Sequence, residues 1–183
     1  MNEGRKQLNQ GYRIARGFVH GVDHLTDGIA FVLKFLVLAL ILVLFVEVVS
    51  RYVFNRPTFW ALETSKMLLG VIGTWGWAYT LKLDGHVRVD VFYSMLPRRG
   101  RAAIDVALSI AFLLPMLYAM IYAGSRRAAR SWATGERMIE SNWLPPAAPF
   151  RTLLVAGFVL FALQCVARFV RDLYALVKNE DMV

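Results

Sequence analysis

Four long apolar segments, separated by polar stretches, dominate the pattern of residues along the chain. They cover residues 28–50, 63–81, 102–124 and 151–174. Each is close to the roughly 20 residues that a helix needs to cross a hydrocarbon layer about 30 Å thick. Because no water reaches lipid-exposed backbone, each amide must find its partner within its own segment, which predicts helices. We therefore expect an all-α integral membrane protein with four transmembrane helices.

Residues 1–27, ahead of the first apolar segment, alternate between polar and apolar positions at the three-four spacing of a helix. Tyr12, Ala15, Val19 and Val22 share one stripe, while charged and amide side chains occupy another. This spacing predicts an amphipathic helix that lies on the membrane surface and leads into the first span. A helix packed on the protein's own loops is the alternative interpretation.

A second boundary element is predicted within residues 81–101, between the second and third spans. As a helix it places Val89, Phe92 and Leu96 on one side, and Pro97 ends it before an arginine cluster. Such a helix would lie flat at the cytoplasmic interface, with its arginines among lipid phosphates. Alternating valines would also fit a strand, but an isolated strand at a membrane surface has no partner for its backbone.

The pattern divides the chain into three parts. Residues 1–27 are expected to form a cytoplasmic or interfacial segment, residues 28–174 a single four-helix membrane domain, and residues 175–183 a cytoplasmic tail. The N-terminal segment does not have the pattern of a cleavable signal peptide. We expect the first span to serve as the targeting signal.

The composition supports a membrane location and changes the meaning of the net charge. The chain is 57% hydrophobic and 19% charged, a balance that soluble domains seldom show. A formal net charge of +8 would suggest a nucleic-acid partner in a soluble protein. Here lysine and arginine lie between and beside the spans, where they set orientation. More of them are inside when both termini are cytoplasmic, although the arginines of residues 125–137 are then outside.

Residues within the predicted spans indicate how the helices pack. Gly70, Thr74 and Ala78 recur at spacings of four, which leaves a shallow stripe that another backbone can approach. Pro115 removes a backbone donor from the third span and should bend that helix. The tryptophans near predicted helix ends fit interfacial anchors. These are Trp60, Trp132 and Trp143.

Two charged residues, Lys34 and Glu47, lie inside the first predicted span, where a charge is costly and a functional site is the default hypothesis. Lys34 is near the cytoplasmic end of the helix and can extend its ammonium group to that interface. Glu47 precedes Arg51 by four residues, so we expect the two side chains to pair near the opposite interface. The alternative is that Glu47 binds a proton or cation in a self-sufficient, proton-coupled antiporter.

No constellation of residues suggests catalysis, a metal or a cofactor. His20 and His24 have a spacing that can hold a metal or haem iron, but no third ligand is nearby, and a solvated polar face is preferred. Cys165, the single cysteine, lies inside the fourth span and offers no disulfide within the chain. Glu63 is expected to cap the second helix or to anchor a partner. A haem-carrying anchor or thiol oxidoreductase would need in-span histidine pairs or several cysteines, so we do not expect an enzyme.

Several short motifs follow one another in a recognisable order. "RYVFNRP" closes the first span, a glutamate at position 63 comes soon after Trp60, and "GHVRVDVFY" follows the second span. "LPRRGRAAIDV" opens the third span, and "SW..GE", "LPP" and "LQ" come later. Over about residues 46–173 this order resembles the small membrane subunit of TRAP transporters, the tripartite ATP-independent periplasmic uptake systems.

The resemblance implies a non-catalytic four-helix subunit that braces a much larger permease in the bacterial inner membrane. In this family the large subunit carries the solute by an elevator-like movement driven by a sodium gradient. A soluble periplasmic receptor delivers the solute, commonly an organic acid. The motif positions carry over as contacts with the large subunit or with lipid headgroups. They are Arg51, Asn55, Pro57, Trp60 and Glu63 on the periplasmic side, and Gly85, His86, Arg88, Asp90, Pro97 and Arg101 on the cytoplasmic side.

The chain departs from the family pattern just ahead of the last span. The family pattern has an aromatic residue before the final proline and a lysine after it. This sequence has Ala148 before Pro149, and Arg151 after it. The resemblance therefore does not define how this segment docks.

Overall fold

The computed structural model describes residues 2–83, 98–139 and 142–178 of the chain. Within these residues there is no β-strand beyond one isolated bridge. The predicted all-α fold is confirmed. The helices are α1 (Asn2–Tyr52), α2 (Ala61–Lys82), α4 (Arg98–Leu108), the π-helical segment η1 (Ser109–Leu113), α5 (Leu114–Thr134) and α6 (Ala147–Lys178).

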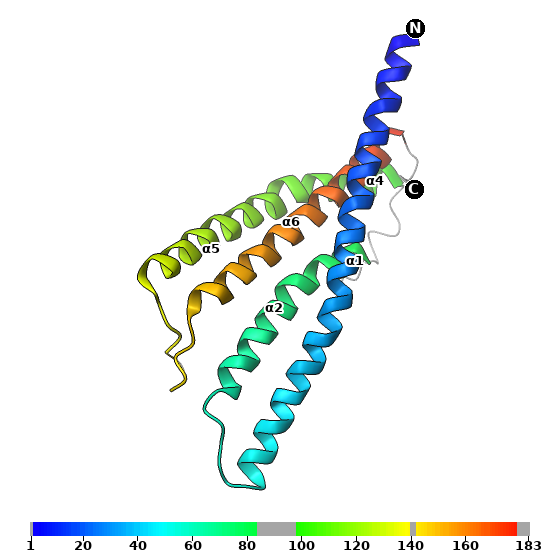
Figure 1. The fold of residues 1–183 in the computed structure, drawn as a ribbon. Helices are drawn as coiled ribbons and strands as arrows, with labels where there is room; N and C mark the ends of the chain where they lie inside the picture. Colours follow the sequence, from blue (N-terminus) through cyan, green and yellow to red (C-terminus); the bar gives the residue numbers. More distant parts are fainter. Residues whose placement is uncertain (1, 84–97, 140–141, 179–183) are drawn as a thin grey trace.

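The helices form an open row (Figure 1). α1 packs on α2, α2 on α6 and α6 on α5, while α4 continues through η1 into α5. α1 also crosses α6, and the α5–α6 pair is inclined to the α1–α2 pair. In the described residues α5 makes no extensive contact with α1 or α2. α6 therefore contacts α1, α2, α4 and α5.

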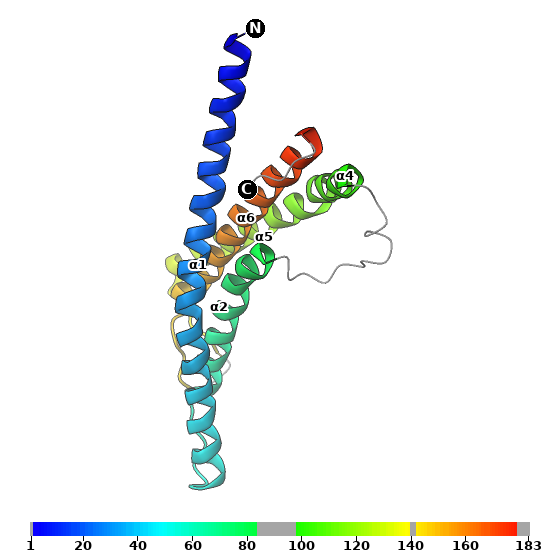
Figure 2. The ribbon, with the colours of Figure 1, turned by 90° about the vertical axis from the view of Figure 1, so that its right-hand side faces the viewer.

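α1 runs without a break from the N-terminal segment through the first predicted span. Figure 2 shows the N-terminal part of α1 projecting beyond the other helices along the same line. The segment is helical, as predicted, and continues directly into the first predicted span, while its location on the membrane surface stays a prediction. Residues 2–52 contain no proline, and glycines such as Gly17 and Gly21 lower the helix propensity by only about 1 kcal/mol each. No residue between the N-terminal segment and the first predicted span therefore interrupts the helix.

α6 covers Val19 and Val22 of the N-terminal apolar stripe. Val19 and Val22 are 4% and 6% exposed and pack against Ala167. Leu163 and Val170 of α6 lie beside them. This contact between two helices of the same chain accounts for the amphipathic pattern at these positions.

Within the part of the chain that the structure describes, three helices are long and apolar enough to cross a membrane, over Ala15–Tyr52, Ala103–Thr134 and Ala147–Tyr174. They contain the first, third and fourth predicted spans. α2 contains the second predicted span, and it carries Glu63 and Lys66 near its N-terminal end and Lys82 at its C-terminal end. It lies between α1 and α6 in the row, and a fourth span over α2 stays a prediction.

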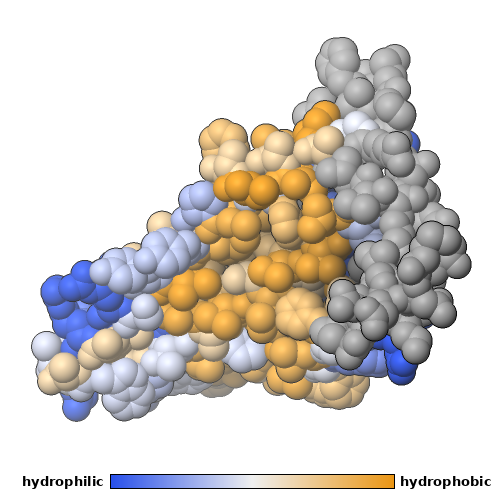
Figure 3. Space-filling view, turned by 90° about the horizontal axis from the view of Figure 1, so that it is seen from above, coloured by the Kyte–Doolittle hydropathy of each residue, from blue (hydrophilic) through white to orange (hydrophobic). Residues whose placement is uncertain are grey.

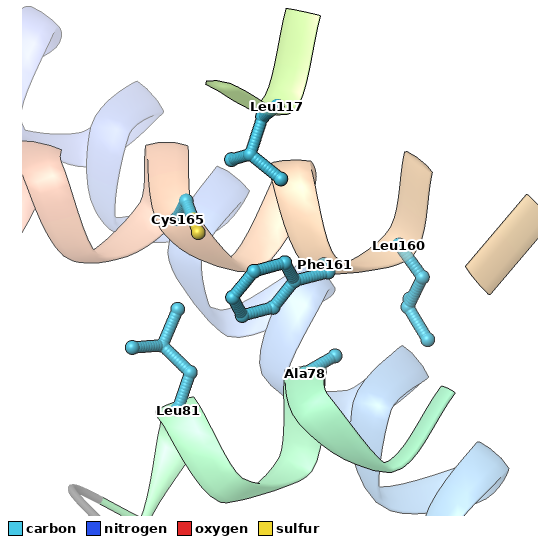
Figure 4. Close-up of a cluster of buried hydrophobic side chains, with 6 residues drawn as sticks. All are labelled: Ala78, Leu81, Leu117, Leu160, Phe161 and Cys165. Carbon is cyan, nitrogen blue, oxygen red and sulfur yellow. The ribbon is translucent and has the colours of Figure 1, made fainter. Parts of the chain in front are cut away.

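The central core lies where α6 is held between α2 and α5. Figure 4 shows Phe161 and Cys165 of α6 facing Ala78 and Leu81 of α2, with Leu117 of α5 on the other side. Cys165 is 3% exposed, as expected of a small apolar side chain within a span. In lipid such contacts stabilise through close packing, since burial from lipid removes no apolar surface from water.

Small residues let α2 and α6 approach closely, as the spacing of Gly70 and Thr74 predicts. A Cβ atom added at Gly157 of α6 would lie 2.5 Å from Cδ1 of Trp75 and 2.7 Å from Oγ1 of Thr74. A Cβ atom at Gly70 would lie 3.0 Å from the ring of Phe150. The helix that fills the predicted stripe therefore belongs to the same chain.

Pro115 disturbs the third span where the sequence predicts, and the disturbance is a π-helical segment. η1 immediately precedes the turn that contains the proline, and the amide of Leu114 bonds to the carbonyl of Ser109, five residues back. A wider turn accommodates the ring of a residue that has no amide hydrogen. The helix consequently continues past Pro115 into α5.

Candidate functional site

A polar network joins α1, α2 and α6 next to the apolar core. Gln164 of α6 is 0% exposed. Its Nε2 donates to Oδ1 of Asp23 at 3.0 Å, and its Oε1 accepts from Oγ1 of Thr26 at 3.2 Å. Both ends of a buried amide are thus satisfied by α1. The network consists of Asp23, Thr26 and Asp27 of α1, Lys82 of α2, and Gln164, Arg168, Arg171 and Asp172 of α6.

Ion pairs extend this network across the helices. A terminal guanidinium nitrogen of Arg171 donates to Oδ2 of Asp23. Nζ of Lys82 donates to Oδ1 of Asp27 and, at 3.4 Å, to the carbonyl oxygen of Asp23. The charged groups of α1 therefore connect it to α6 and to α2 at the same level.

Arg168 completes the polar network on α6. Its Nε lies 3.7 Å from Oδ2 of Asp172, and its Nη1 donates to the carbonyl oxygen of Leu81 at 3.5 Å. Within the network three carboxylates face three cationic side chains, so it carries no excess charge with which to bind an ion. The arrangement is that of a staple between helices.

The polar network was not among the candidate sites predicted from the sequence. The signal that could have found it is spacing, since the polar residues of α1 and of α6 each recur at three-four intervals on one helix face. Spacing does not show that the two faces meet. Asp23 and Gln164 are 141 positions apart, and only the crossing of α1 and α6 brings them together.

The predicted pair of Glu47 and Arg51 is present near the C-terminal end of α1. Nε of Arg51 donates to Oε1 of Glu47 at 2.9 Å. The backbone amide of Thr58 donates to Oε2 at 3.0 Å, and the hydroxyl of Thr58 donates to the same oxygen. Glu47 therefore holds both the last turn of its own helix and the loop that follows.

The other candidates in this loop and in the last turn of α1 are accessible. Arg51, Asn55 and Pro57 are exposed, and Trp60 is half-buried. Asn55 has a left-handed backbone with φ of 52°, a conformation that asparagine adopts more readily than most residues. The loop consequently presents these side chains to the surroundings while Glu47 fixes its two ends.

Glu63 lies in the first turn of α2, as predicted, and is 0% exposed. No described residue donates a hydrogen bond to either of its carboxylate oxygens. Any support that it gives to the helix end is therefore electrostatic, through the positive end of the helix dipole. Anchoring of a partner by Glu63 stays a prediction.

The remaining candidates are the in-span Lys34, the residues of α4 and α2, and those of the predicted interfacial helix. Lys34 is exposed on α1, with its Nζ 5.8 Å from the centroid of the Phe31 ring. Arg101 is half-buried in α4, and the stripe of small residues on α2 faces α6. The predicted interfacial helix and five of its candidates lie outside the described residues. These five are Gly85, His86, Arg88, Asp90 and Pro97.

The two histidines of the N-terminal segment lie on a solvated face, as predicted. His20 and His24 are exposed, and Nε2 of His20 accepts from Nε of Arg16 at 3.4 Å. The described residues bring no three metal-ligating side chains of the His, Cys, Asp or Glu type together.

A second clamp fixes the loop between α5 and α6. Both terminal nitrogens of Arg151 donate to the carboxylate of Glu136, with Nη2 2.6 Å from Oε1, and Nη1 also donates to the hydroxyl of the buried Ser131. The hydrogen bonds and positive charge of Arg151 hold the pKa of Glu136 below its ordinary value. The planar fork of the Arg151 guanidinium makes a bidentate contact with Glu136 that a lysine could not make.

Comparison with known families decides which class this arrangement belongs to. The family model described as tripartite ATP-independent periplasmic transporters, DctQ component, matches residues 40–175. The chain belongs to this family. The family is one of transporter components and not of enzymes. Together with the apolar helices, membership indicates that this DctQ-family chain is an inner-membrane protein.

Individual relatives support the same assignment. The chain is 30% identical over 117 residues to the C4-dicarboxylate TRAP transporter small permease protein DctQ and to the sialic acid TRAP transporter small permease protein SiaQ, both of Vibrio cholerae. These matches cover 62% of this chain, 50% of DctQ and 66% of SiaQ. The ectoine TRAP transporter small permease protein TeaB of Halomonas elongata is 27% identical over 77 residues, which are 42% of this chain and 40% of TeaB. The chain spans about half the length of DctQ.

Proposed function

We propose that this chain is the non-catalytic small subunit of a TRAP uptake transporter and that it braces the large permease subunit. The large subunit would carry the solute in symport, driven by a sodium gradient. A periplasmic receptor would deliver the solute by transient contact. Secondary active transport of an organic acid would then be a property of the assembled complex, with both termini of this chain in the cytoplasm.

The observation that carries this proposal is that polar side chains form hydrogen bonds and ion pairs with one another between helices of this chain. Gln164, fully buried in α6, uses both ends of its amide to bond with α1. The surrounding polar network is balanced in charge and ties helix to helix. A transport site near the middle of the membrane needs polar groups that face the solute, commonly on broken helices. The polar groups of this network face one another instead, which supports a scaffold.

The open row of helices supplies the surface that a brace requires. Exposed aromatic side chains, among them Phe31, Phe35 and Phe45, cover the outer side of α1. In a membrane such a surface meets either lipid or another apolar protein. Helices arranged side by side can cover a wide area of a larger partner.

The names of the relatives bear on the solute. DctQ is named for C4-dicarboxylates, SiaQ for sialic acid and TeaB for ectoine. Small permease proteins that are 27–30% identical to this chain are thus named for chemically different solutes. We therefore assign solute specificity to the receptor and the large subunit. The names of DctQ and SiaQ refer to organic acids, and they support an organic acid as the solute of this system as well.

Affinity purification of the tagged full chain from native membranes tests the proposal. We expect a larger multi-span permease to co-purify, and uptake in proteoliposomes to require both proteins and the receptor. Uptake by this chain alone in proteoliposomes would remove the scaffold role.

The self-sufficient antiporter makes a different prediction for Glu47. Both of its carboxylate oxygens already accept hydrogen bonds, from Arg51 and from Thr58. In an antiporter Glu47→Gln would abolish proton coupling in the isolated chain. In a scaffold the same substitution loosens the loop and leaves the coupling ion of the complex unchanged. Ion-flux measurements on the complex and on the isolated chain distinguish the two.

A further inference from the structure

A basic cleft lies at the end of α5, away from the polar network. Figure 3 shows hydrophilic residues gathered where α5 approaches the loop to α6, next to an apolar surface over the middle of the molecule. The cleft has a volume of about 680 Å³, within the range of small-ligand sites. It is lined by Ala123, Arg126, Arg127, Ala129 and Arg130 of α5, Glu136 of the loop and Arg151 of α6.

The basic cleft carries more positive charge than its own acid can neutralise. Glu136 is the carboxylate in the lining given by the described residues, and Arg151 already engages it with two nitrogens. Arg127 and Arg130 are exposed and extend from the same face of α5. Guanidinium groups collected in this way suit an anion with several acceptor oxygens, above all a phosphate.

The helix dipole does not account for these arginines. Cationic side chains offset the dipole when they lie in the last turn of a helix. The last turn of α5 contains no basic residue, because its arginines end at Arg130 and the helix ends at Thr134. In the predicted orientation these arginines lie on the periplasmic side of the membrane, whereas lysine and arginine usually prefer the cytoplasmic side. An anionic ligand would stabilise positive charges in that position.

Their depth along α5 matches the lipid headgroups. The apolar stretch of this helix is predicted to end at residue 124, and Arg126 to Arg130 follow within the next six residues. At 1.5 Å per residue they lie roughly 3 to 9 Å beyond the apolar stretch, and the headgroup layer extends about 5 to 8 Å from the hydrocarbon. Arg126 donates to the hydroxyl of Tyr122 at 3.0 Å, and tyrosine favours this interfacial layer.

An apolar pocket adjoins the basic cleft. It has a volume of about 270 Å³ and shares Arg127 and Arg151 with the cleft, while Met138, Ala147, Phe150 and Leu154 line the rest. A free anion would use only the basic cleft. A molecule with a phosphate at one end and a hydrocarbon at the other would fill both cavities.

We propose that the basic cleft and the apolar pocket together form a binding site for one anionic phospholipid, with its phosphate among Arg126, Arg127 and Arg130. The lipid would hold the outer end of α5 at the membrane boundary and so explain why arginines persist on that side. This inference does not rest on the proposed transport function, because the site is built from this chain alone.

Native mass spectrometry of the delipidated full chain, titrated with phosphatidylglycerol, tests the site. We expect one saturable phosphatidylglycerol per chain. Arg127→Gln combined with Arg130→Gln should weaken that binding roughly tenfold or more, because two charge-assisted hydrogen bonds are lost. Ala123→Leu keeps every charge and should also weaken binding by narrowing the cleft. Circular dichroism checks that each variant is folded.

The matched control combines Arg13→Gln with Arg16→Gln, which removes the same charge from the exposed face of α1 and should leave the saturable site intact. An equal loss in this control would reduce the effect to general attraction of charge. Phosphatidylcholine that binds as tightly as phosphatidylglycerol would overturn the requirement for an anionic lipid, and inorganic phosphate that does so would make the site one for a free anion. Unchanged lipid binding in the α5 double variant, with loss of co-purifying permease, would make the cleft a protein-docking surface.

Discussion

The ion pair between Asp23 of α1 and Arg171 of α6 can be measured with a double-mutant cycle. Asp23→Asn and Arg171→Gln remove the charges with little change in side-chain size, and the amide introduced at position 23 can still accept a bond from Gln164. The paired side chains are 17% and 30% exposed, so solvent screens them only partly. A hydrogen bond to a charged group contributes about 1.5–3 kcal/mol in water, and cycles in membrane proteins average about 0.6 and reach about 1.7 kcal/mol. We expect a coupling energy of about 1 to 2 kcal/mol.

The same helix offers an internal control. Nε of Arg168 and Oδ2 of Asp172 lie 3.7 Å apart within α6, and an i, i+4 pair of this kind contributes about 0.2–0.5 kcal/mol. Unfolding of all variants in mixed micelles by added SDS, followed by circular dichroism, gives both coupling energies under identical conditions. A coupling between Asp23 and Arg171 no larger than that of the control would refute the reasoning, because the polar network would then be a set of solvated contacts and not a staple.

Three further outcomes follow from the structure. Gly157→Ala should destabilise the chain by about 1–3 kcal/mol in thermal unfolding, because the added methyl group overpacks against α2. Gly73→Ala is the control and should have no such effect, because a Cβ atom there meets nothing within 4 Å. Equal effects of the two substitutions would contradict the close contact between α2 and α6. Because the folded-state pKa of Glu136 is lowered, its contribution to stability is complete above the ordinary glutamate pKa near 4.5 and is lost as pH falls through the lower folded value. Glu136→Gln should flatten that part of the pH–stability profile, and an unchanged profile would exclude the clamp. Glu47→Gln should speed hydrogen exchange at the Thr58 amide; unaltered exchange there would show that another group holds the loop.

Short-range features of this fold could be predicted because neighbours in a helix are neighbours in sequence. The pairing of Glu47 with Arg51 follows from a separation of four residues and is present. The disturbance ahead of Pro115 follows from a missing amide hydrogen, although its π-helical form does not. Helices were predictable as a class, because apolar segments of this length have no other way to satisfy their backbone in lipid.

The sequence by itself determined the all-α membrane class, the positions of the apolar helices and the local pairs within them. Only the tertiary structure decided that Gln164 meets Asp23, that Gly157 lies against Thr74, and that α6 covers Val19 and Val22. The physical reason is distance along the chain. Helical periodicity shows which residues share a face, but the partner of that face depends on how separate helices cross, and an apolar surface in lipid has no strong preference for one neighbour over another.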